Sequence, residues 1–424
     1  MDVLWRRPRR FRRIFTLLAV LGPGLVTMLA GDDAGGIATY AQAGAAYGYQ
    51  LLWLLGVVTL SLAVVNEMGA RMGVVTGKGL ADLIRERFGV RSTAIVMLLL
   101  LLANLVTTMA EFAGIAAGAE LFGVSRWASV PVMAAVVWIL VTRGSYPVVE
   151  KVMLSIGVVY LAYIASGILA HPPWDVVLQT TVAPRPPLER DYFLLAIGLV
   201  GTTVTPWMQF NLQATISEKG VPEDRLGYSR TDVITGAVLA NAIAFFIIVA
   251  TAAVLHGHLS PEQLANMQAA DYARALAPVA GPAAEFLFGI GLFGASTLAA
   301  GVVPLSTSYT ITEAFGWERG VGQRMADAPA FFGIFTGLIA VGALTILVPG
   351  VPLISLILFS QVINGLILSV TLVCMLVLVN DRRIMGAHRN GLIANVVGGA
   401  TLVLTIGLAL LFILTAVPGT PLAG

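Results

Sequence analysis

Long apolar runs separated by short polar stretches dominate the hydrophobic pattern of the chain. A run of about 20 apolar residues is long enough to cross a bilayer as an α-helix. Such runs predict eleven membrane-spanning helices, at residues 14–47, 50–74, 92–122, 126–142, 146–170, 191–218, 229–257, 282–314, 329–349, 351–380 and 391–417. The pattern therefore predicts an all-α polytopic membrane protein, with a short interfacial helix in the loop at 258–281.

Two of these predicted helices are interrupted. The first contains Gly31-Asp32-Asp33-Ala34-Gly35-Gly36, and a charged aspartate at a helix centre costs roughly 2.5–3.5 kcal/mol in a membrane. The sixth contains Pro206, which removes a backbone donor and disrupts the preceding turn, although alone it could be a plain kink. Matching breaks in two halves of a transporter point to a substrate site.

The two breaks lie five predicted helices apart, which indicates two five-helix repeats. Because five is odd, the halves would be inverted in the membrane. We expect one transmembrane domain over 1–424, in which 1–170 and 191–380 are the repeats and 391–417 is an extra helix.

The distribution of basic residues predicts the topology. Twenty-one of the 25 Lys and Arg residues fall on the side that holds the N-terminus, and Arg126, Arg185, Arg190 and Arg274 fall on the other. Because cytoplasmic loops carry the excess of basic residues, the N-terminus is expected in the cytoplasm and the C-terminus outside the plasma membrane. The arginine-rich start is interpreted as a topogenic anchor rather than a cleaved leader.

Composition agrees with this class. The chain is 58% hydrophobic and 11% charged, whereas soluble domains carry about 25% charged residues. One cysteine, Cys374, excludes a disulfide framework or a thiolate metal cluster. The net charge of +2 gives no sign of a nucleic-acid partner, so the expected partners are lipid and a small solute.

Several motifs resemble one family. Gly22-Pro23-Gly24, Asp33-Ala34-Gly35-Gly36-Ile37-Ala38-Thr39 and Val75-Thr76-Gly77-Lys78 resemble the first half of the NRAMP divalent-metal transporters. Weaker matches follow at Ala110-Glu111 with Gly114, at Thr205-Pro206-Trp207 and at Gln361.

The resemblance implies a LeuT-like inverted repeat of five plus five helices with an eleventh, unwound in helices 1 and 6. It implies alternating access around a metal site, no enzymatic activity, no resident cofactor and a monomeric protein. The implied metal-site residues are Asp33, Thr205, Gln361, Gly36 and the carbonyls of Ala30 and Thr202.

This chain departs from the family pattern at the site. Gly36 replaces an asparagine, Thr205 a methionine, Trp207 and Leu212 histidines, and Thr108 an aspartate on the proton route. This set of changes is similar to that of the NRAMP-related magnesium transporters, a divergent branch. Methionine sulfur favours soft transition metals, whereas hard oxygen ligands suit Mg²⁺. The expected substrate is therefore Mg²⁺, with Mn²⁺ also accepted.

Proton coupling is not expected, because the four histidines all lie near predicted helix ends and a proton path needs titratable groups. The expected gate or pathway residues are Asp32, Glu111, Thr108, Trp207 and Gln209.

Some of these residues could instead have purely structural roles. Asp32 could face an aqueous vestibule or cap the second half-helix, and Glu111 could bond unwound backbone. Thr205 could bond its own helix, and Gln361 could bond a neighbouring helix.

Other functions remain as alternatives. A proton-coupled Mn²⁺/Fe²⁺ transporter would need the missing soft ligand and histidines, and Asp33 would repel the carboxylate of an amino-acid substrate. An intramembrane enzyme lacks a recognisable motif, because Asp32 and Asp33 are neighbours whose side chains diverge. Uncoupled transport by a channel looks similar, and only saturable, slow kinetics would separate a carrier from it.

Overall fold

The computed structural model describes residues 31–143 and 162–416. Within these residues the fold is helical, and nine helical segments are long and apolar enough to cross a bilayer. The long helices are α3 (Ala34–Tyr47), α4 (Leu52–Thr76), α5 (Leu80–Glu120), α6 (Arg126–Arg143), α9 (Arg190–Thr203), α10 (Pro206–Glu218), α11 (Leu226–Leu255), α15 (Ala284–Phe315), α16 (Pro329–Ile346), α17 (Leu353–Asn380) and α19 (Leu392–Ala416).

Shorter helices fill the connections. They are α8 (Trp174–Val182), α12 (Pro261–Ala265), α13 (Ala269–Ala273), α14 (Ala277–Ala280), α18 (Arg382–Met385) and the 3-10 turns η2 (Glu223–Arg225), η3 (Arg274–Leu276), η4 (Gly281–Ala283) and η5 (Gly386–His388). The short helix predicted at 258–281 is present as α12, α13 and α14, whereas α8 was not predicted.

The predicted spans agree closely with the observed helices, with one clear exception. The third span was predicted to begin at 92, but α5 begins at Leu80. Gly89 has a left-handed φ of 79°, so the helix bends there. A first section of mixed apolar and charged residues, 80–88, precedes the apolar one. Most of the predicted spans 14–47 and 146–170 lies outside the described residues.

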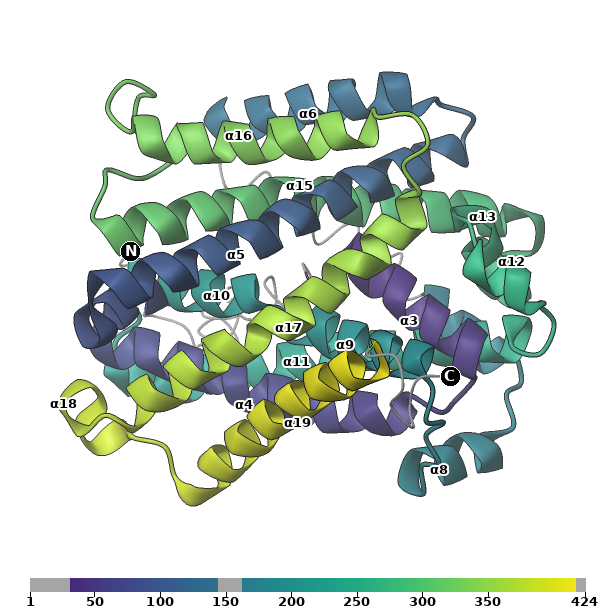
Figure 1. Ribbon diagram of the computed structural model, residues 1–424, viewed down its shortest axis with the longest axis horizontal. Coiled ribbons are helices and arrows are strands. Elements are labelled where there is room, and N and C mark those ends of the chain that lie inside the picture. The colour runs from purple at the N-terminus through teal and green to yellow at the C-terminus, as the bar shows by residue number, and fades with distance from the viewer. Residues whose placement is uncertain (1–30, 144–161, 417–424) are drawn as a thin grey trace, which may run out of the picture.

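Figure 1 shows how the long helices are arranged. α5 lies beside α15 through the middle of the molecule, and α17 crosses in front of them. α16 and α6 flank this pair on one side, while α4, α9 and α19 lie on the other. Elements from both halves of the chain therefore pack against one another throughout.

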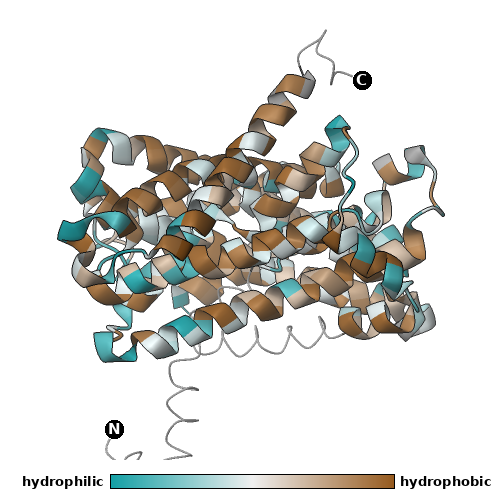
Figure 2. Ribbon diagram, turned by 90° about the horizontal axis from the view of Figure 1, so that it is seen from below, coloured by the Kyte–Doolittle hydropathy of each residue, from teal (hydrophilic) through white to brown (hydrophobic). Residues whose placement is uncertain are grey.

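Outward-facing side chains are largely apolar. Figure 2 shows hydrophobic residues along the lengths of the helices and hydrophilic ones mainly near their ends. On α19, Leu392 is 80% exposed and Val403 is 72% exposed. Exposed leucine and valine along a long helix fit contact with lipid tails, so this is an integral membrane fold.

Glycines allow the central helices to approach closely. A Cβ on Gly201 of α9 would lie 2.1 Å from the carbonyl oxygen of Gln361 and 2.4 Å from the backbone nitrogen of Gly365. Only hydrogen fits there, so α9 and α17 pack backbone to backbone. This contact holds α17 beside the break that follows α9.

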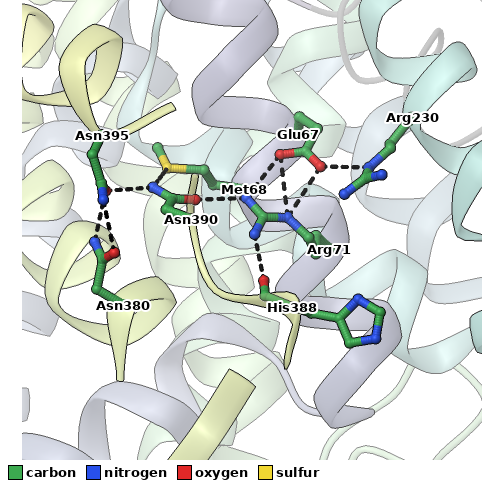
Figure 3. Close-up of polar contacts among 8 residues, drawn as sticks. All are labelled: Glu67, Met68, Arg71, Arg230, Asn380, His388, Asn390 and Asn395. Atoms are coloured by element: carbon green, nitrogen blue, oxygen red, sulfur yellow. Dashed lines mark hydrogen bonds and ion pairs between the residues drawn. The ribbon is translucent and has the colours of Figure 1, made fainter. Parts of the chain in front are cut away.

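A cluster of polar side chains joins α4, α11 and the connection into α19 (Figure 3). The Glu67 carboxylate pairs with Arg71 on α4 at 3.0 Å and with Arg230 on α11 at 2.7 Å. Arg71 also donates to the carbonyl of His388 and, at 2.6 Å, to Asn390 Oδ1. Two arginines balance one partly buried carboxylate, so this cluster ties α4 to α11 and to the connection into α19.

Candidate metal-ion site

The first break lies at the start of α3. Residues 31–33 are not helical, and the helix begins at Ala34. Asp33 is its N-cap residue, because Asp33 Oδ1 accepts a hydrogen bond of 3.0 Å from the Gly36 backbone nitrogen. The carboxylate therefore lies at the positive end of the helix, where negative charge is stabilised.

Asp32 does not cap this helix. The N-cap residue is Asp33, and Asp32 is a buried residue, 3% exposed, that precedes it.

The second break separates α9 from α10. Val204 and Thr205 are non-helical, and Pro206 is the first residue of α10. Proline fits this first position because its missing N–H would have no partner in the first turn. The prediction that the sixth span is interrupted at Pro206 is confirmed.

Thr205 lies at this break and is buried, 2% exposed. Thr205 Oγ1 donates to the Thr202 carbonyl oxygen at 3.1 Å and lies 3.1 Å from Met208 Sδ. Two of the expected ligand atoms, the Thr205 hydroxyl and the Thr202 carbonyl, are therefore neighbours. The alternative that Thr205 bonds its own backbone holds in this structure.

The two breaks face each other. A Cβ on Gly36 would lie 3.1 Å from the Gly31 carbonyl oxygen and 3.6 Å from Thr202 Oγ1. Nearby, the Tyr40 hydroxyl bonds Thr203 Oγ1 at 2.9 Å. The space at Gly36 is thus bounded by polar atoms of both breaks.

Gln361 reaches the same place from α17. A Cβ on Gly35 would lie 1.8 Å from Gln361 Nε2 and 3.0 Å from Asp33 Oδ1. Gln361 Oε1 accepts from Asn364 Nδ2 at 3.3 Å, and its Nε2 donates to Ser360 Oγ at 2.9 Å. The structure therefore brings the Gln361 amide beside Asp33.

Glu111 approaches from α5. Its Oε2 accepts from the Ala34 backbone nitrogen at 3.4 Å, so it supports the unwound segment as one of its two expected roles. Thr108 lies one turn away and donates to the Asn104 carbonyl at 2.6 Å. Ala30, the remaining expected ligand, lies outside the described residues.

Trp207 and Gln209 are fully buried on α10. Within the described residues, neither the Trp207 indole nitrogen nor the Gln209 amide has a hydrogen-bond partner. Met208 and Asn364 were not expected at the site. Met208 follows Thr205 by three residues, which is the spacing of neighbours on a helix face, and that was the available signal.

The donors gathered here are mostly oxygen. In residues 31–143 and 162–416, no group of three or more His, Cys, Asp and Glu side chains is arranged to hold a metal ion. Any ion bound between the breaks would rely on one or two carboxylates together with hydroxyl, amide and carbonyl oxygens, which are hard ligands.

The fold and the paired breaks define a class, that of multi-span helical membrane proteins with interrupted helices that meet at their breaks. The chain matches a family model described as natural resistance-associated macrophage protein-like (Nramp) over residues 24–415. The chain therefore belongs to the Nramp family, as its motifs indicated.

Similar sequences agree with this family membership. The divalent metal cation transporter MntH of Aeromonas hydrophila is 30% identical, over 92% of this chain and 94% of the relative. MntH of Verminephrobacter eiseniae is 31% identical, over 97% of this chain and 93% of the relative.

Among solved structures, the manganese transporter of Eremococcus coleocola, in complex with an aromatic bis-isothiourea substituted compound, has a TM-score of 0.79 at 21% identity. The match covers 96% of this chain and 88% of that one. MhsT in complex with L-phenylalanine has a TM-score of 0.59 at 15% identity, over 93% of this chain and 98% of the other. These likenesses confirm the predicted LeuT-like fold.

Proposed function

We propose that this protein is a carrier of divalent metal ions whose main substrate is Mg²⁺, with Mn²⁺ also transported. The family and its MntH relatives support the transport of a divalent metal cation. The preference for Mg²⁺ rests on the residues that face each other across the two breaks.

The observation that carries this proposal is the Thr205 hydroxyl at the second break. It lies beside the Thr202 carbonyl, while Asp33 and the Gln361 amide lie together at the first break. A carboxylate, a hydroxyl and a carbonyl offer oxygen to the ion, and the Gln361 amide would add its oxygen by turning, since its Nε2 lies nearest Gly35 and its Oε1 accepts from Asn364. Such a set suits Mg²⁺, whereas a sulfur ligand would select Mn²⁺, Fe²⁺ or Cd²⁺.

Gly36 supports the same preference because it places no side chain between the two breaks. A larger side chain there would project toward the Gly31 carbonyl and Thr202 Oγ1. Mg²⁺ gives up its water reluctantly and keeps several water ligands in most protein sites. We propose that the absence of a side chain at Gly36 lets the ion keep part of its water shell at the site.

Met208 favours a second candidate. Its sulfur lies 3.1 Å from the Thr205 hydroxyl, so a rotation of that side chain could offer a soft ligand. This supports transport of Mn²⁺ and keeps a proton-coupled Mn²⁺/Fe²⁺ carrier as the alternative function.

The carrier would work by alternating access without proton coupling. The four histidines lie at or beyond the ends of the spanning helices, and Thr108 bonds its own helix. The membrane potential supplies about 4.6 kcal/mol per 100 mV for a dication, from about 2.3 kcal/mol per charge. Asp32, Glu111, Trp207 and Gln209 are proposed to line or gate the path.

The membrane, the orientation and the oligomeric state of the carrier are part of the proposal. The basic-residue distribution favours the plasma membrane with a cytoplasmic N-terminus, and we expect a monomer.

Titration calorimetry of the purified protein with Mg²⁺, Mn²⁺ and Cd²⁺ tests the substrate. Mg²⁺ should bind and Asp33→Ala should abolish the signal, whereas Asp175→Ala, in the exposed helix α8, should bind like wild type. Strong Cd²⁺ binding with no heat from Mg²⁺ would reject the Mg²⁺ proposal in favour of the soft-metal candidate.

A further inference from the structure

A stripe of buried polar side chains continues along α5 from Glu111 toward the Leu80 end of the helix. Asn104, Thr107 and Thr108 precede Glu111 by seven, four and three residues, which is the spacing of one helix face. All are fully buried. At about 1.5 Å per residue, Asn104 lies about 10 Å along the axis from Glu111.

Two asparagines of this region have fixed orientations. Asn104 Nδ2 donates to Thr307 Oγ1 on α15 at 2.7 Å, and Asn364 Nδ2 of α17 donates to Thr107 Oγ1 at 3.0 Å. Each threonine hydroxyl donates to a carbonyl of its own helix. Because its hydrogen is already used, each hydroxyl can only accept, so the asparagine must turn its nitrogen toward it.

The amide oxygens of Asn104 and Asn364 therefore point away from these threonines. Within the described part of the chain, Asn104 Oδ1 and Asn364 Oδ1 have no hydrogen-bond donor, and neither has Glu111 Oε1. A buried acceptor without a donor lowers the stability of a fold, and a leucine would fill either asparagine position at less cost. These positions are therefore poorly explained by packing alone.

These three oxygens are hydrogen-bond acceptors, and the water shell of a hydrated cation would supply hydrogen-bond donors to them. Water bound to Mg²⁺ points its O–H groups outward as strong donors. Asn364 also donates to Gln361 Oε1 at 3.3 Å, which links this region directly to the residues beside Asp33.

We propose that Asn104 and Asn364 form a second, uncharged station that holds a divalent cation through its water shell. This inference rests on the proposed function. The station lies between the site at Asp33 and the Leu80 end of α5. Uncharged oxygens suit such a place because an ion on a path must bind weakly enough to leave.

Two hydrogen bonds join neighbouring segments beyond the station, next to the Leu80 end of α5. Gln213 Nε2 donates to the Lys78 carbonyl at 3.0 Å, and Ser217 Oγ donates to the Gly77 carbonyl at 2.6 Å. These bonds join α10 to the loop before α5. Release at this end requires them to part, while the station holds the ion.

Asn104→Leu and Asn364→Leu test the station in the full chain. In proteoliposomes each should lower the rate of Mg²⁺ uptake about tenfold, which corresponds to about 1.4 kcal/mol. In Asn104→Leu, whose asparagine bonds Thr307 on α15, the Mg²⁺ Kd at the Asp33 site should stay within about twofold. The Tm of both purified variants should not fall, because an unpaired polar atom is removed. A merely structural role would lower the Tm instead.

Asn241→Leu is the matched control. Among residues 31–143 and 162–416, the buried Asn241 of α11 also has an oxygen without a donor, and its nitrogen bonds its own helix at Ala237. This variant should take up Mg²⁺ like wild type. If Asn104→Leu and Asn364→Leu both take up Mg²⁺ as fast as Asn241→Leu, the station does not exist. If Asn104→Leu loses Mg²⁺ binding as much as uptake, Asn104 belongs to the Asp33 site instead.

Asn104→Asp tests the station if the leucine variants do not fold. Asn104→Asp keeps the shape and adds a charge, so calorimetry should detect a second bound Mg²⁺ and uptake should slow. An unchanged stoichiometry with unchanged uptake would overturn the proposal. Failure of the proposed function is recognised separately, because wild type itself would then show no Mg²⁺ uptake.

Discussion

Asp33 performs two tasks that two substitutions can separate. Its Oδ1 caps α3 through the Gly36 N–H at 3.0 Å, and its charge is proposed to bind the ion. Asparagine caps a helix as well as aspartate does, whereas alanine does not. Asp33→Asn should therefore remove the charge alone, and Asp33→Ala should remove both the charge and the cap.

The two effects have different sizes. A dication and a carboxylate about 2.1 Å apart attract each other by about 4 kcal/mol even at the dielectric constant of water. That free energy corresponds to about a thousandfold in Kd. Loss of the cap should cost about 1 kcal/mol of unfolding free energy.

Calorimetry with Mg²⁺ and thermal unfolding in metal-free detergent solution measure both quantities. Both variants should lose Mg²⁺ affinity about a thousandfold, but only Asp33→Ala should have a lower Tm. If Asp33→Asn binds Mg²⁺ within tenfold of wild type, the carboxylate is not a ligand. An equal loss of Tm in both variants would refute the capping argument.

Three further predictions follow from individual contacts. Met208→Leu should leave Mg²⁺ uptake unchanged but weaken Cd²⁺ competition about tenfold, and equal Cd²⁺ competition in both proteins would show that its sulfur never reaches the ion. Gly201→Ala should lower the unfolding free energy by about 1–3 kcal/mol, because its Cβ would meet α17 backbone at 2.1 Å, while Gly337→Ala, which has open space, should not lower the Tm. Glu67→Gln should destabilise the fold by about 3–5 kcal/mol, because it leaves the buried Arg71 without its carboxylate, and an unchanged Tm would show that Arg71 finds other partners.

Much of the fold could be predicted because the bilayer imposes a simple length rule. Apolar runs of about 20 residues gave boundaries such as 50–74 for α4 and 351–380 for α17, which lie within two residues of the observed helices. Pro206 likewise marked the break after α9, because proline cannot continue a helix without disruption. The start of α5 could not be predicted from hydropathy, since residues 80–88 are helical but mix apolar and charged residues.

The candidate site was predicted only in part. The carboxylate in the first break and the hydroxyl in the second could be recognised from residue type and position. Which of two adjacent aspartates caps α3 depends on backbone geometry, and so does the approach of Met208 to Thr205. Asn104 and Asn364 were missed because an asparagine in an apolar span has the same sequence pattern whether or not its oxygen finds a partner.

The most direct test of the proposed function is Mg²⁺ uptake into proteoliposomes under an imposed inside-negative potential, with internal Mg²⁺ and internal pH recorded together. The account predicts saturable uptake that follows the potential while the internal pH stays constant. Acidification in step with Mg²⁺ uptake, or uptake of Mn²⁺ without any of Mg²⁺, would contradict it.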